Sequence, residues 1–365
     1  MIKNIELTNY KCFDELSIRL SEMTVIAGQN GAGKSSVIQA LLLLRQSYNG
    51  KLEDFNSQFI FNGNLADLKD AFAVHCIKGT GDNIRIAVSD SHVEDDDFWA
   101  EIPGTEEIKL AKGTVSDNYE TALKQSSLFA SDFIYLYADR LSPQVTYMKG
   151  VDHFTHSRIG DRTGHLAGFR LQQAMDDSEE VIIDALCFNP ALKKVSDNVS
   201  LWLGHIMGES LTVTTEGQKD ENEVAIVYKQ NGIPVSPVNM AFGYTYVLPI
   251  IFALMTAAPD SLIIIENPEA HLHPSAQLRL GELLAKAAQQ GVQIIVETHS
   301  DHLLNGIRVA AKKKEIESSK VSIHYFWKDQ DGHYDYEIEL LQDGTLGAWP
   351  EGFFDEWEKA LQSIM

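Results

Sequence analysis

The start of the chain alternates apolar and polar positions, a pattern that predicts β-strands. Ile2, Ile5 and Leu7 mark a first strand, and the apolar stretch MTVIAG from Met23 marks a second that runs into a glycine-rich turn. Residues 35–45, SSVIQALLLLR, lack Gly and Pro and are apolar around most of a helical circumference. This composition predicts a helix buried against a sheet. We therefore expect two strands and then a helix at the start of the chain.

The middle of the chain mixes short strands with helical segments. Strand-like pieces separated by Gly, Asn and Asp occur over residues 59–88, and the stretch FIYLYADR predicts another strand within residues 131–148. Apolar positions at three-to-four spacing over residues 166–207 predict a helical block. Residues 211–234 resemble a β-hairpin around the polar sequence GQKDENE.

The last third alternates buried strands with helices. A helix is expected after Gly243, a strand at SLIIIE, a helix over residues 275–290, a strand at QIIVE and a helix after Ser300. Strands that are apolar throughout and alternate with helices indicate a parallel sheet covered on both faces. The predicted fold class is therefore α/β with a mostly parallel core sheet.

The glycine-rich turn has the sequence expected of a phosphate-binding loop. Residues 28–35, GQNGAGKS, fit the pattern Gly, four residues, Gly-Lys-Ser and lie between a predicted strand and a predicted helix. Glycines let backbone N–H groups point inward, and the helix N-terminus adds partial positive charge. Lys34 would reach the β- and γ-phosphates, and the Ser35 hydroxyl would ligate Mg²⁺. The candidate nucleotide ligands are Gly28, Asn30, Gly31, Ala32, Gly33, Lys34, Ser35 and Ser36. The alternative is a turn without a ligand.

Two later strands end in polar residues that suit the same site. The strand SLIIIE ends at Glu266, where a phosphate-loop protein places the carboxylate that holds Mg²⁺. The strand QIIVE runs into Thr298, His299 and Ser300, and a histidine at that point can face the γ-phosphate. Packing at the end of a strand is the alternative for Glu266 and for His299.

Together, NYKCF at residues 9–13, the GQNGAGKSS loop, ENPEAHLHP and ETHSDHLL make the chain similar to the ABC-type ATPase heads of the family that includes the RecF, SMC and overcoming-lysogenization-defect (OLD) proteins. It resembles in particular compact prokaryotic members with a WPEGFFDE-like tail, which is residues 349–356 in this chain. The resemblance implies a P-loop NTPase fold with an N-terminal antiparallel β-subdomain. It also implies one ATPase domain over residues 1–365, with a helical insertion near 150–210 and a hairpin at 211–234.

The resemblance further implies a homodimer, or a larger even oligomer, that encloses ATP and Mg²⁺. In such heads a signature segment of one copy covers the nucleotide of the other, and the candidate is NMAFGYTY at residues 239–246. Gly243 would permit close backbone approach, and Thr245 would direct its hydroxyl at the partner's γ-phosphate. Tyr246 stands where similar proteins have Gln. A turn leading into a core helix is the alternative.

A second departure concerns the catalytic base. Similar proteins place a glutamate directly after the metal-binding acid, but this chain has Asn267 after Glu266. An amide cannot accept the proton of the attacking water. Either Glu269 supplies that function, or hydrolysis is slow and the ATP-bound pair persists, which is the interpretation we favour.

Two further groups of residues have more than one interpretation. His271, His273, His299 and His302 could form a metal site, since imidazoles suit zinc or manganese. The resemblance instead places His271 and His273 in a loop facing the opposite subunit. Arg140, between a strand and a turn, is expected to form a structural salt bridge.

Charge and cysteine content narrow the partners and the compartment. The 52 Asp and Glu exceed the 30 Lys and Arg, which leaves a formal net charge of −22. Nucleic acid is therefore a possible but disfavoured ligand. Cys12, Cys76 and Cys187 are too few for a disulfide framework, and no signal peptide or bilayer-length apolar run is present. We expect a cytoplasmic protein without a membrane anchor.

Two functions from different classes follow. The first is an ATPase that acts as a sensor or regulatory switch for a separately encoded effector, a nuclease or toxin, in anti-phage defence; it rests on what resembling ATPases do. The second is a RecF-like DNA-binding repair or recombination ATPase. The charge favours the first, because only short basic clusters such as residues 312–314 are available. We expect neither coiled-coil arms nor a Toprim nuclease domain, because residues 35–242 show no sustained heptads and little chain follows His299.

Overall fold

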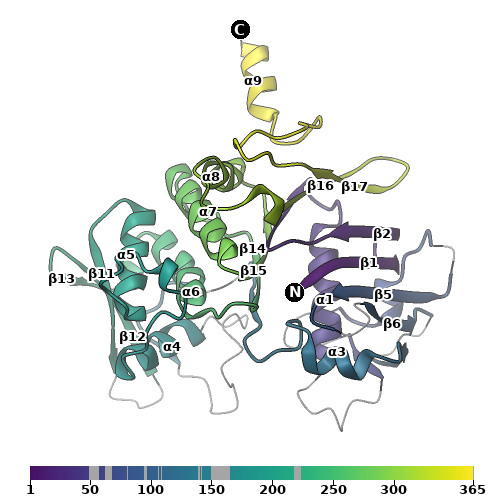
Figure 1. Cartoon of the computed structure of the whole chain (residues 1–365), viewed down its shortest axis with the longest axis horizontal. Coiled ribbons are helices and arrows are strands. Elements are labelled where there is room, and N and C mark those ends of the chain that lie inside the picture. The colour runs from purple at the N-terminus through teal and green to yellow at the C-terminus, as the bar shows by residue number, and fades with distance from the viewer. Residues whose placement is uncertain are drawn as a thin grey trace. The chain divides into compact units, whose positions relative to one another are not determined.

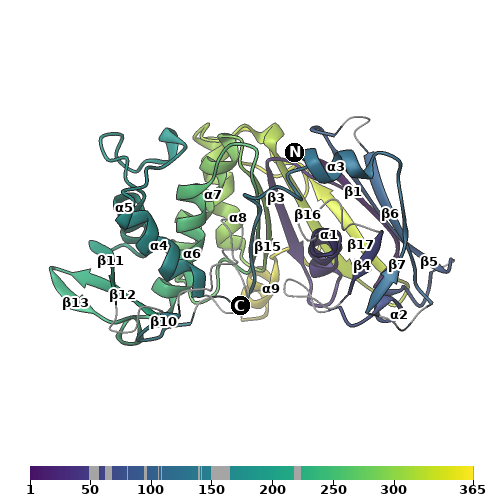
Figure 2. The same ribbon diagram turned by 90° about the horizontal axis from the view of Figure 1, so that it is seen from below.

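A computed structural model describes most of the chain, in two compact units. The described residues are 1–48, 57–61, 68–79, 81–93, 97–105, 107, 109–138, 140, 142–148, 165–217 and 223–364. Unit 1 comprises Met1–Ala130, Val321–Leu341 and Thr345–Met365, and unit 2 comprises Ser131–Lys320 and Gln342–Gly344. Figures 1 and 2 show the elements of both units. The expectation of a single ATPase domain stays a prediction.

Unit 1 contains an antiparallel sheet. Its strands lie in the order β2 (Phe13–Arg19), β1 (Ile2–Tyr10), β5 (Asn83–Asp90), β6 (Asp97–Pro103) and β8 (Thr114–Val115). Figure 1 shows β2, β1, β5 and β6 in this order. The start of the chain therefore forms one strand more than predicted, because the chain reverses at Lys11, whose φ is 55°, and pairs β1 with β2.

A second group of strands in unit 1 holds the phosphate loop. Strand β3 (Met23–Gly28) pairs in parallel with β16 (Val321–Lys328), which pairs antiparallel with β17 (His333–Ile338). Helix α1 (Lys34–Ser47) starts directly after the loop, and nearly all its apolar side chains are buried, as the sequence predicts. The remaining elements of unit 1 are β4 (Gln58–Ile60), β7 (Leu110–Lys112), α2 (Ala71–Val74), α3 (Tyr119–Gln125) and α9 (Glu356–Ile364).

The parallel strands of unit 2 are the apolar runs of the last third. Strand β14 (Leu262–Glu266) pairs in parallel with both β15 (Gln293–Thr298) and β9 (Ile134–Leu136), and every residue of the three strands is buried. Helix α7 (Pro274–Gln289) follows β14, and helix α8 (Asp301–Lys312) follows β15. This strand and helix alternation is the arrangement that the pattern predicts.

A second layer of unit 2 combines helices with a hairpin. The helices are α4 (His165–Asp176), α5 (Val195–Met207) and α6 (Phe242–Thr256), and the strands are β10 (Tyr147–Met148), β11 (Leu211–Gly217), β12 (Glu223–Gln230) and β13 (Ile233–Val235). Strands β11 and β12 pair antiparallel, and α5 packs against β11 and α6. Figure 1 shows α5 and α6 beside these strands. Short 3₁₀ helices occur at Asp184–Leu186, Pro237–Asn239 and Ser318–Lys320.

The predicted helical block over residues 166–207 is interrupted between α4 and α5. A proline at position 190 removes a helical N–H and disfavours helical geometry at Asn189. The Asn198 side chain then satisfies this irregular segment, accepting from the Phe188 N–H at 2.7 Å and donating to the Leu192 carbonyl at 2.9 Å. None of the helices within the described ranges is both long and apolar enough to cross a bilayer.

Helices α7 and α8 cross at direct backbone contact. A Cβ added to Gly281 would lie 2.2 Å from the carbonyl oxygen of Leu303, and one added to Gly306 would lie 2.1 Å from that of Leu278. Distances this short are incompatible with any side chain at either position. The two glycines therefore set the separation of the helices that follow β14 and β15.

We predict that Gly306→Ala destabilises unit 2. Alanine favours the helical backbone by about 1 kcal/mol, but overpacking at this crossing costs about 1–3 kcal/mol, so the net loss of stability reaches about 2 kcal/mol. Urea unfolding followed by circular dichroism measures the change. Lys312→Ala, an exposed position on the same helix, is the control and should stay within about 0.5 kcal/mol of wild type. Equal midpoints for Gly306→Ala and wild type would contradict the close crossing.

Candidate nucleotide-binding site

The phosphate loop has the backbone geometry of an anion cradle. Gly28, Gly31 and Gly33 have φ values of 140°, 71° and 106°, a region that side chains strongly disfavour. The loop ends at Gly33, and helix α1 starts at Lys34. The N-terminus of a long buried helix thus adjoins the loop and directs its N–H groups toward it. The residues present fit a bound phosphate chain.

Neighbouring segments fix the loop closely. A Cβ on Gly28 would lie 2.0 Å from the carbonyl oxygen of Phe326, and one on Gly33 would lie 2.3 Å from the ring of Phe13 and 2.8 Å from Cys12 Sγ. Two of the glycines are therefore required by contact as well as by φ. The NYKCF segment thus lies against the end of the loop.

Lys34 is 4% exposed and folds back onto the loop. Its ammonium donates hydrogen bonds to the carbonyl oxygens of Gly28 at 3.1 Å and Gln29 at 2.8 Å. Ala32 is fully buried, Asn30 and Gly31 are exposed, and Ser35 is half-buried. The Ser36 N–H donates to the Gly33 carbonyl at 2.9 Å, within the first turn of α1. The loop is thus held by internal hydrogen bonds that a phosphate group could replace at Lys34.

Lys328 is a second cation beside the loop, and sequence reasoning missed it. A Cβ built on Gly31 would lie 2.9 Å from Lys328 Nζ. The register of β16 against β3 places Phe326 opposite Gly28, so Lys328 lies two residues beyond the start of the loop. Adjacent parallel strands end at the same edge of a sheet, where α/β proteins bind ligands. The signal was a lysine at the end of a strand whose pairing partner the sequence did not reveal.

The segment between β1 and β2 adds two titratable groups near α1. Burial lowers the pKa of the Lys11 ammonium, which donates to Gln39 on α1. Burial also raises the pKa of the Cys12 thiol, whose sulfur lies 4.0 Å from Ser36 Oγ. Cys12 is therefore held as a neutral thiol at pH 7 and is a packing contact of the loop.

Glu266 ends β14 and is 7% exposed. Its carboxylate accepts hydrogen bonds from the Tyr135 hydroxyl at 3.0 Å and from the Ala138 N–H at 3.3 Å. Burial, followed by the nearby carboxylates of Glu266 and Glu297, raises the pKa of Tyr135, so its hydroxyl stays protonated and donates. Two donors, one on β9 and one just after it, thus orient the predicted metal-binding carboxylate.

Arg140 ties together the chain ends around β14. Its guanidinium donates to the carbonyl oxygens of Glu266 at 2.7 Å and Asn267 at 2.7 Å. It also donates to the carbonyls of Tyr137 at 3.0 Å and Tyr246 at 3.3 Å, and lies 4.3 Å from the centre of the Tyr246 ring. The partners of this structural arginine are thus backbone carbonyls and an aromatic ring. Tyr246, which stands where similar proteins have Gln, supplies the ring against which the Arg140 guanidinium packs.

Burial lowers the pKa of Arg140 to about 10, while Tyr246, Glu269 and Glu266 act in the opposite direction. The guanidinium therefore remains charged at neutral pH. Asn267 has a φ of 44°, and its N–H donates to the Glu297 carbonyl at 2.8 Å. Its side-chain oxygen is buried and forms no hydrogen bond with the part of the chain that the structure describes.

Glu269 links the loop after β14 to the loop after β15. One carboxylate oxygen accepts from the Thr298 hydroxyl at 2.8 Å, and the other accepts from the His299 N–H at 2.7 Å. The Thr298 hydroxyl in turn accepts from the Ser300 N–H at 3.0 Å, and Ser300 caps α8 by accepting from the Leu303 N–H at 3.0 Å. The exposed His299 is thus presented by a hydrogen-bonded turn that depends on Glu269.

The candidate signature segment is used largely inside unit 2. Thr245 is fully buried, and its hydroxyl lies 3.2 Å from the Tyr228 hydroxyl on β12. A Cβ on Gly243 would lie 2.6 Å from the His271 carbonyl oxygen, so the close backbone approach at Gly243 is to the loop before α7. The exposed residues at the start of α6 are Ala241 and Phe242. In this structure Thr245 does not present its hydroxyl at the surface.

The four histidines do not gather into one metal-binding cluster. His271 packs against Phe242 with ring centres 4.3 Å apart, and the His273 side chain accepts from the Ser275 N–H at 3.3 Å. Within the described ranges, no group of three or more His, Cys, Asp or Glu side chains is placed to hold a metal ion. His271 and His273 therefore have packing and helix-capping contacts.

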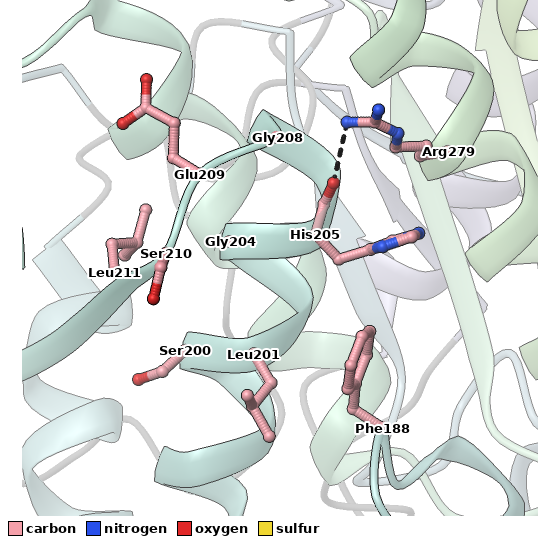
Figure 3. A pocket seen from close by; sticks show the side chains of 10 residues that line it. All are labelled: Phe188, Ser200, Leu201, Gly204, His205, Gly208, Glu209, Ser210, Leu211 and Arg279. Carbon is pink, nitrogen blue, oxygen red and sulfur yellow. Dashed lines mark hydrogen bonds between the residues drawn. The ribbon is translucent and has the colours of Figure 1, made fainter.

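A cavity of about 390 Å³ lies elsewhere in unit 2, between the end of α5, the start of β11 and α7 (Figure 3). Arg279 donates to the His205 carbonyl at 2.9 Å and so satisfies a backbone acceptor at the C-terminus of α5 (Figure 3). Burial, followed by the charge of Arg279, lowers the pKa of His205. None of the nucleotide-binding or catalytic residues predicted from the sequence lines this cavity.

The strand, glycine loop and helix, together with a buried parallel strand that ends in a carboxylate, define a P-loop NTPase. The family model described as "AAA domain, putative AbiEii toxin, Type IV TA system" matches residues 116–305, more than half of the chain, so the protein belongs to this family. A model described as "AAA ATPase domain" matches residues 1–149, and "Protein of unknown function (DUF3696)" matches residues 316–364. The predicted resemblance to ABC-, SMC- and OLD-type ATPase heads is confirmed.

The chain is similar to a curated relative and to solved structures of SMC heads. An OLD nuclease of Thermus scotoductus is 22% identical over 317 residues, which cover 82% of this chain. The chain spans 59% of the length of that relative. The SMC head bound to the C-winged helix domain of ScpA has a TM-score of 0.54 at 15% identity, covering 93% of this chain and 98% of that chain.

An SMC head of Pyrococcus furiosus with an extended coiled coil, bound to the C-terminal domain of ScpA, has a TM-score of 0.53 at 14% identity. The likeness covers 100% of this chain and 99% of that chain. These two likenesses confirm the predicted fold class, an ABC-type ATPase head.

We predict that Arg140→Lys destabilises unit 2 by about 2–5 kcal/mol, because one ammonium cannot satisfy four carbonyl oxygens and each buried acceptor left unpaired costs about 1–3 kcal/mol. Urea unfolding at pH 7 measures the loss. Arg279→Lys, which loses contacts at a half-exposed helix end, is the control and should cost about 1 kcal/mol or less. Similar losses in the two variants would show that Arg140 does not hold the end of β14.

Proposed function

We propose that this ATPase binds ATP at the phosphate loop and hydrolyses it slowly, acting as a switch. The observation that carries the proposal is the loop itself. Its left-handed glycines, its buried lysine and the start of α1 form a cradle that positions phosphate through fixed dipoles. Lys328, beside Gly31, adds a cation at the same loop. These local positive groups offset the net charge of −22 where a nucleotide needs it.

Slow hydrolysis is supported by the residues that follow Glu266. Asn267 carries an amide, which cannot take a proton from water. Glu269 is the nearest alternative carboxylate in sequence, but both of its oxygens already accept hydrogen bonds, from Thr298 and from His299. Protonation of Glu269 would remove its negative charge and weaken both hydrogen bonds, which hold the turn that presents His299. We therefore assign Glu269 a positioning role.

Magnesium is assigned to Ser35 and Glu266. A serine hydroxyl and a carboxylate are the oxygen ligands that phosphate-loop proteins use for this ion, which would neutralise phosphate charge. Tyr135 and Ala138 hold the Glu266 carboxylate in one orientation. The Ser35 hydroxyl and the oriented Glu266 carboxylate thus suit the metal-ligand role that the resemblance implies.

A second copy of the chain is the proposed partner of the nucleotide-bound state. The start of α6 supports this, because Ala241 and Phe242 are exposed there, with Phe242 packed on His271. Helix N-terminal N–H groups at this point could meet the partner's phosphates. Gly243 allows the close packing that holds this helix start in place, while Thr245 would contribute only after leaving Tyr228.

A separately encoded effector is the proposed target of the switch, in anti-phage defence. The description of the matching family names a putative toxin of a type IV toxin–antitoxin system, and the curated relative is an OLD nuclease. The acidic composition of this chain favours a basic protein partner over DNA as the direct contact.

We predict that Lys34→Ala weakens ATP binding by about tenfold to 100-fold, because it removes a charge-assisted contact with phosphate. Calorimetric titration with ATP and Mg²⁺ measures affinity, and light scattering measures the mass of the particle. Wild type should dimerise with ATP, and Lys34→Ala should stay monomeric. Lys69→Ala, an exposed lysine of unit 1, is the control and should behave as wild type.

The same pair of variants tests the effector. Tagged wild type, expressed with its neighbouring genes and purified with ATP, should retain a protein partner that Lys34→Ala loses. Recovery of DNA without a protein from wild type would overturn the switch proposal and would support the RecF-like repair alternative.

We predict that wild type turns over ATP more slowly than about 1 s⁻¹, and that Asn267→Glu raises the rate at least tenfold by supplying the missing carboxylate. Steady-state phosphate release measures both rates. Glu269→Gln separates base from positioning residue. If Glu269 is the base, Glu269→Gln should lower kcat at least 100-fold and leave the ATP affinity unchanged. If Glu269 is a positioning residue, Glu269→Gln should change kcat and the ATP affinity only modestly. Rapid wild-type turnover would rule out the slow switch.

A further inference from the structure

The β16–β17 hairpin in unit 1 carries a row of aromatic rings on one face. Its antiparallel register places Tyr325 opposite Tyr336 and Trp327 opposite Tyr334, and residues two apart on a strand share a face. Tyr325 and Trp327 stack with ring centres 5.8 Å apart, and Trp327 and Tyr334 stack at 5.4 Å. The hairpin therefore offers flat, aligned ring surfaces.

The segment before α9 turns this face into a cavity of about 370 Å³, which we call the aromatic pocket. Tyr325, Trp327 and Tyr336 line one side of the cavity. Trp349 and Glu351, in the segment before α9, line the other side. Trp349 is 47% exposed and Tyr336 is 45% exposed, so these two rings remain accessible, whereas Tyr325 is buried at the base of the face. Figure 1 shows β16 and β17 beside the segment that leads into α9.

The wall of the aromatic pocket is fixed by packing. Phe353 is 1% exposed and meets the rings of Tyr325 at 5.3 Å and Trp349 at 5.2 Å. A Cβ on Gly352 would lie 2.5 Å from the Tyr325 hydroxyl, so a glycine is needed for the segment to approach this closely. Such anchoring presents Trp349 and Glu351 in a defined place, which favours a built site over a chance hollow.

Charge identifies the ligand. Residues 329–358 contain ten Asp and Glu and no Lys or Arg, and Glu351 is the charged residue in the lining of the pocket. Stacked rings alone would also suit nucleobases. The phosphates of a nucleic acid, however, would be repelled by this acidic segment. Electron-rich ring faces next to a carboxylate favour a flat cation instead.

We propose that the aromatic pocket binds an arginine side chain presented by a basic segment of a partner protein. A guanidinium stacks on Trp and Tyr rings and pairs with a carboxylate, which are the two kinds of group that the pocket combines. The lining contains no residue of the phosphate loop. Peptide binding and ATP binding are therefore separable, and this inference does not rest on the proposed switch.

Calorimetry of the whole chain with a capped peptide of alternating Gly and Arg tests the proposal, at physiological salt and without nucleotide. The expected result is saturable binding, weaker binding of the corresponding Lys peptide and none of the Glu peptide. Absence of saturable binding by the Arg peptide would overturn the proposal, as would tighter binding of a short oligothymidylate.

Matched variants locate the binding. Trp349→Ala should weaken the Arg peptide about tenfold or more, and Trp349→Phe should keep most of the affinity because a ring remains. Glu351→Gln should weaken binding several-fold, whereas Glu339→Gln, which removes the same charge outside the lining, should not. Equal losses for the two charge variants would show nonspecific attraction and refute the site. Thermal melting of each variant controls for folding. Trp349→Phe should melt at the wild-type temperature. If Trp349→Ala unfolds, the affinities of Trp349→Phe and Glu351→Gln for the Arg peptide still test the site.

Discussion

The buried guanidinium of Arg140 is the contact on which the arrangement of unit 2 depends. The segment after β9, the end of β14 and the first turns of α6 all leave carbonyl oxygens pointing at one place, and one side chain satisfies them. A buried charge is stable only when it is well bonded, and here its partners are dipoles of the backbone. The positions of Glu266 and Asn267 thus follow from an arginine that donates hydrogen bonds to their backbone carbonyls.

The sequence predicted the elements that repeat a strong pattern and missed those set by distant contacts. The buried strands β14 and β15, the helices after them and the phosphate loop follow from apolar runs and glycine spacing. The extra strand at the start depends on the reversal at Lys11, and the break between α4 and α5 depends on the contacts of Asn198. Lys328 could not be placed, because strand pairing across 298 residues, as between Met23 and Val321, has no local signal.

The candidate site shows the same division between chemistry and context. The residue types that handle phosphate could be predicted, since their spacing is tied to the loop. How each side chain is engaged could not. Glu269 holds a turn, Thr245 is buried against Tyr228, and Tyr246 supports Arg140. In each case a polar or aromatic group is committed to a partner that lies far away in the sequence, and only the fold reveals the partner.

The glycine contact between α7 and α8 has a consequence for how the two loops move. Gly281 and Gly306 leave no layer of side chains between the helices, so there is nothing compressible to absorb a displacement. Helix α7 starts where the loop after Glu266 ends, and α8 starts two residues after His299. A shift of one loop must therefore displace the other, which makes the acidic loop and the histidine turn a single mechanical part.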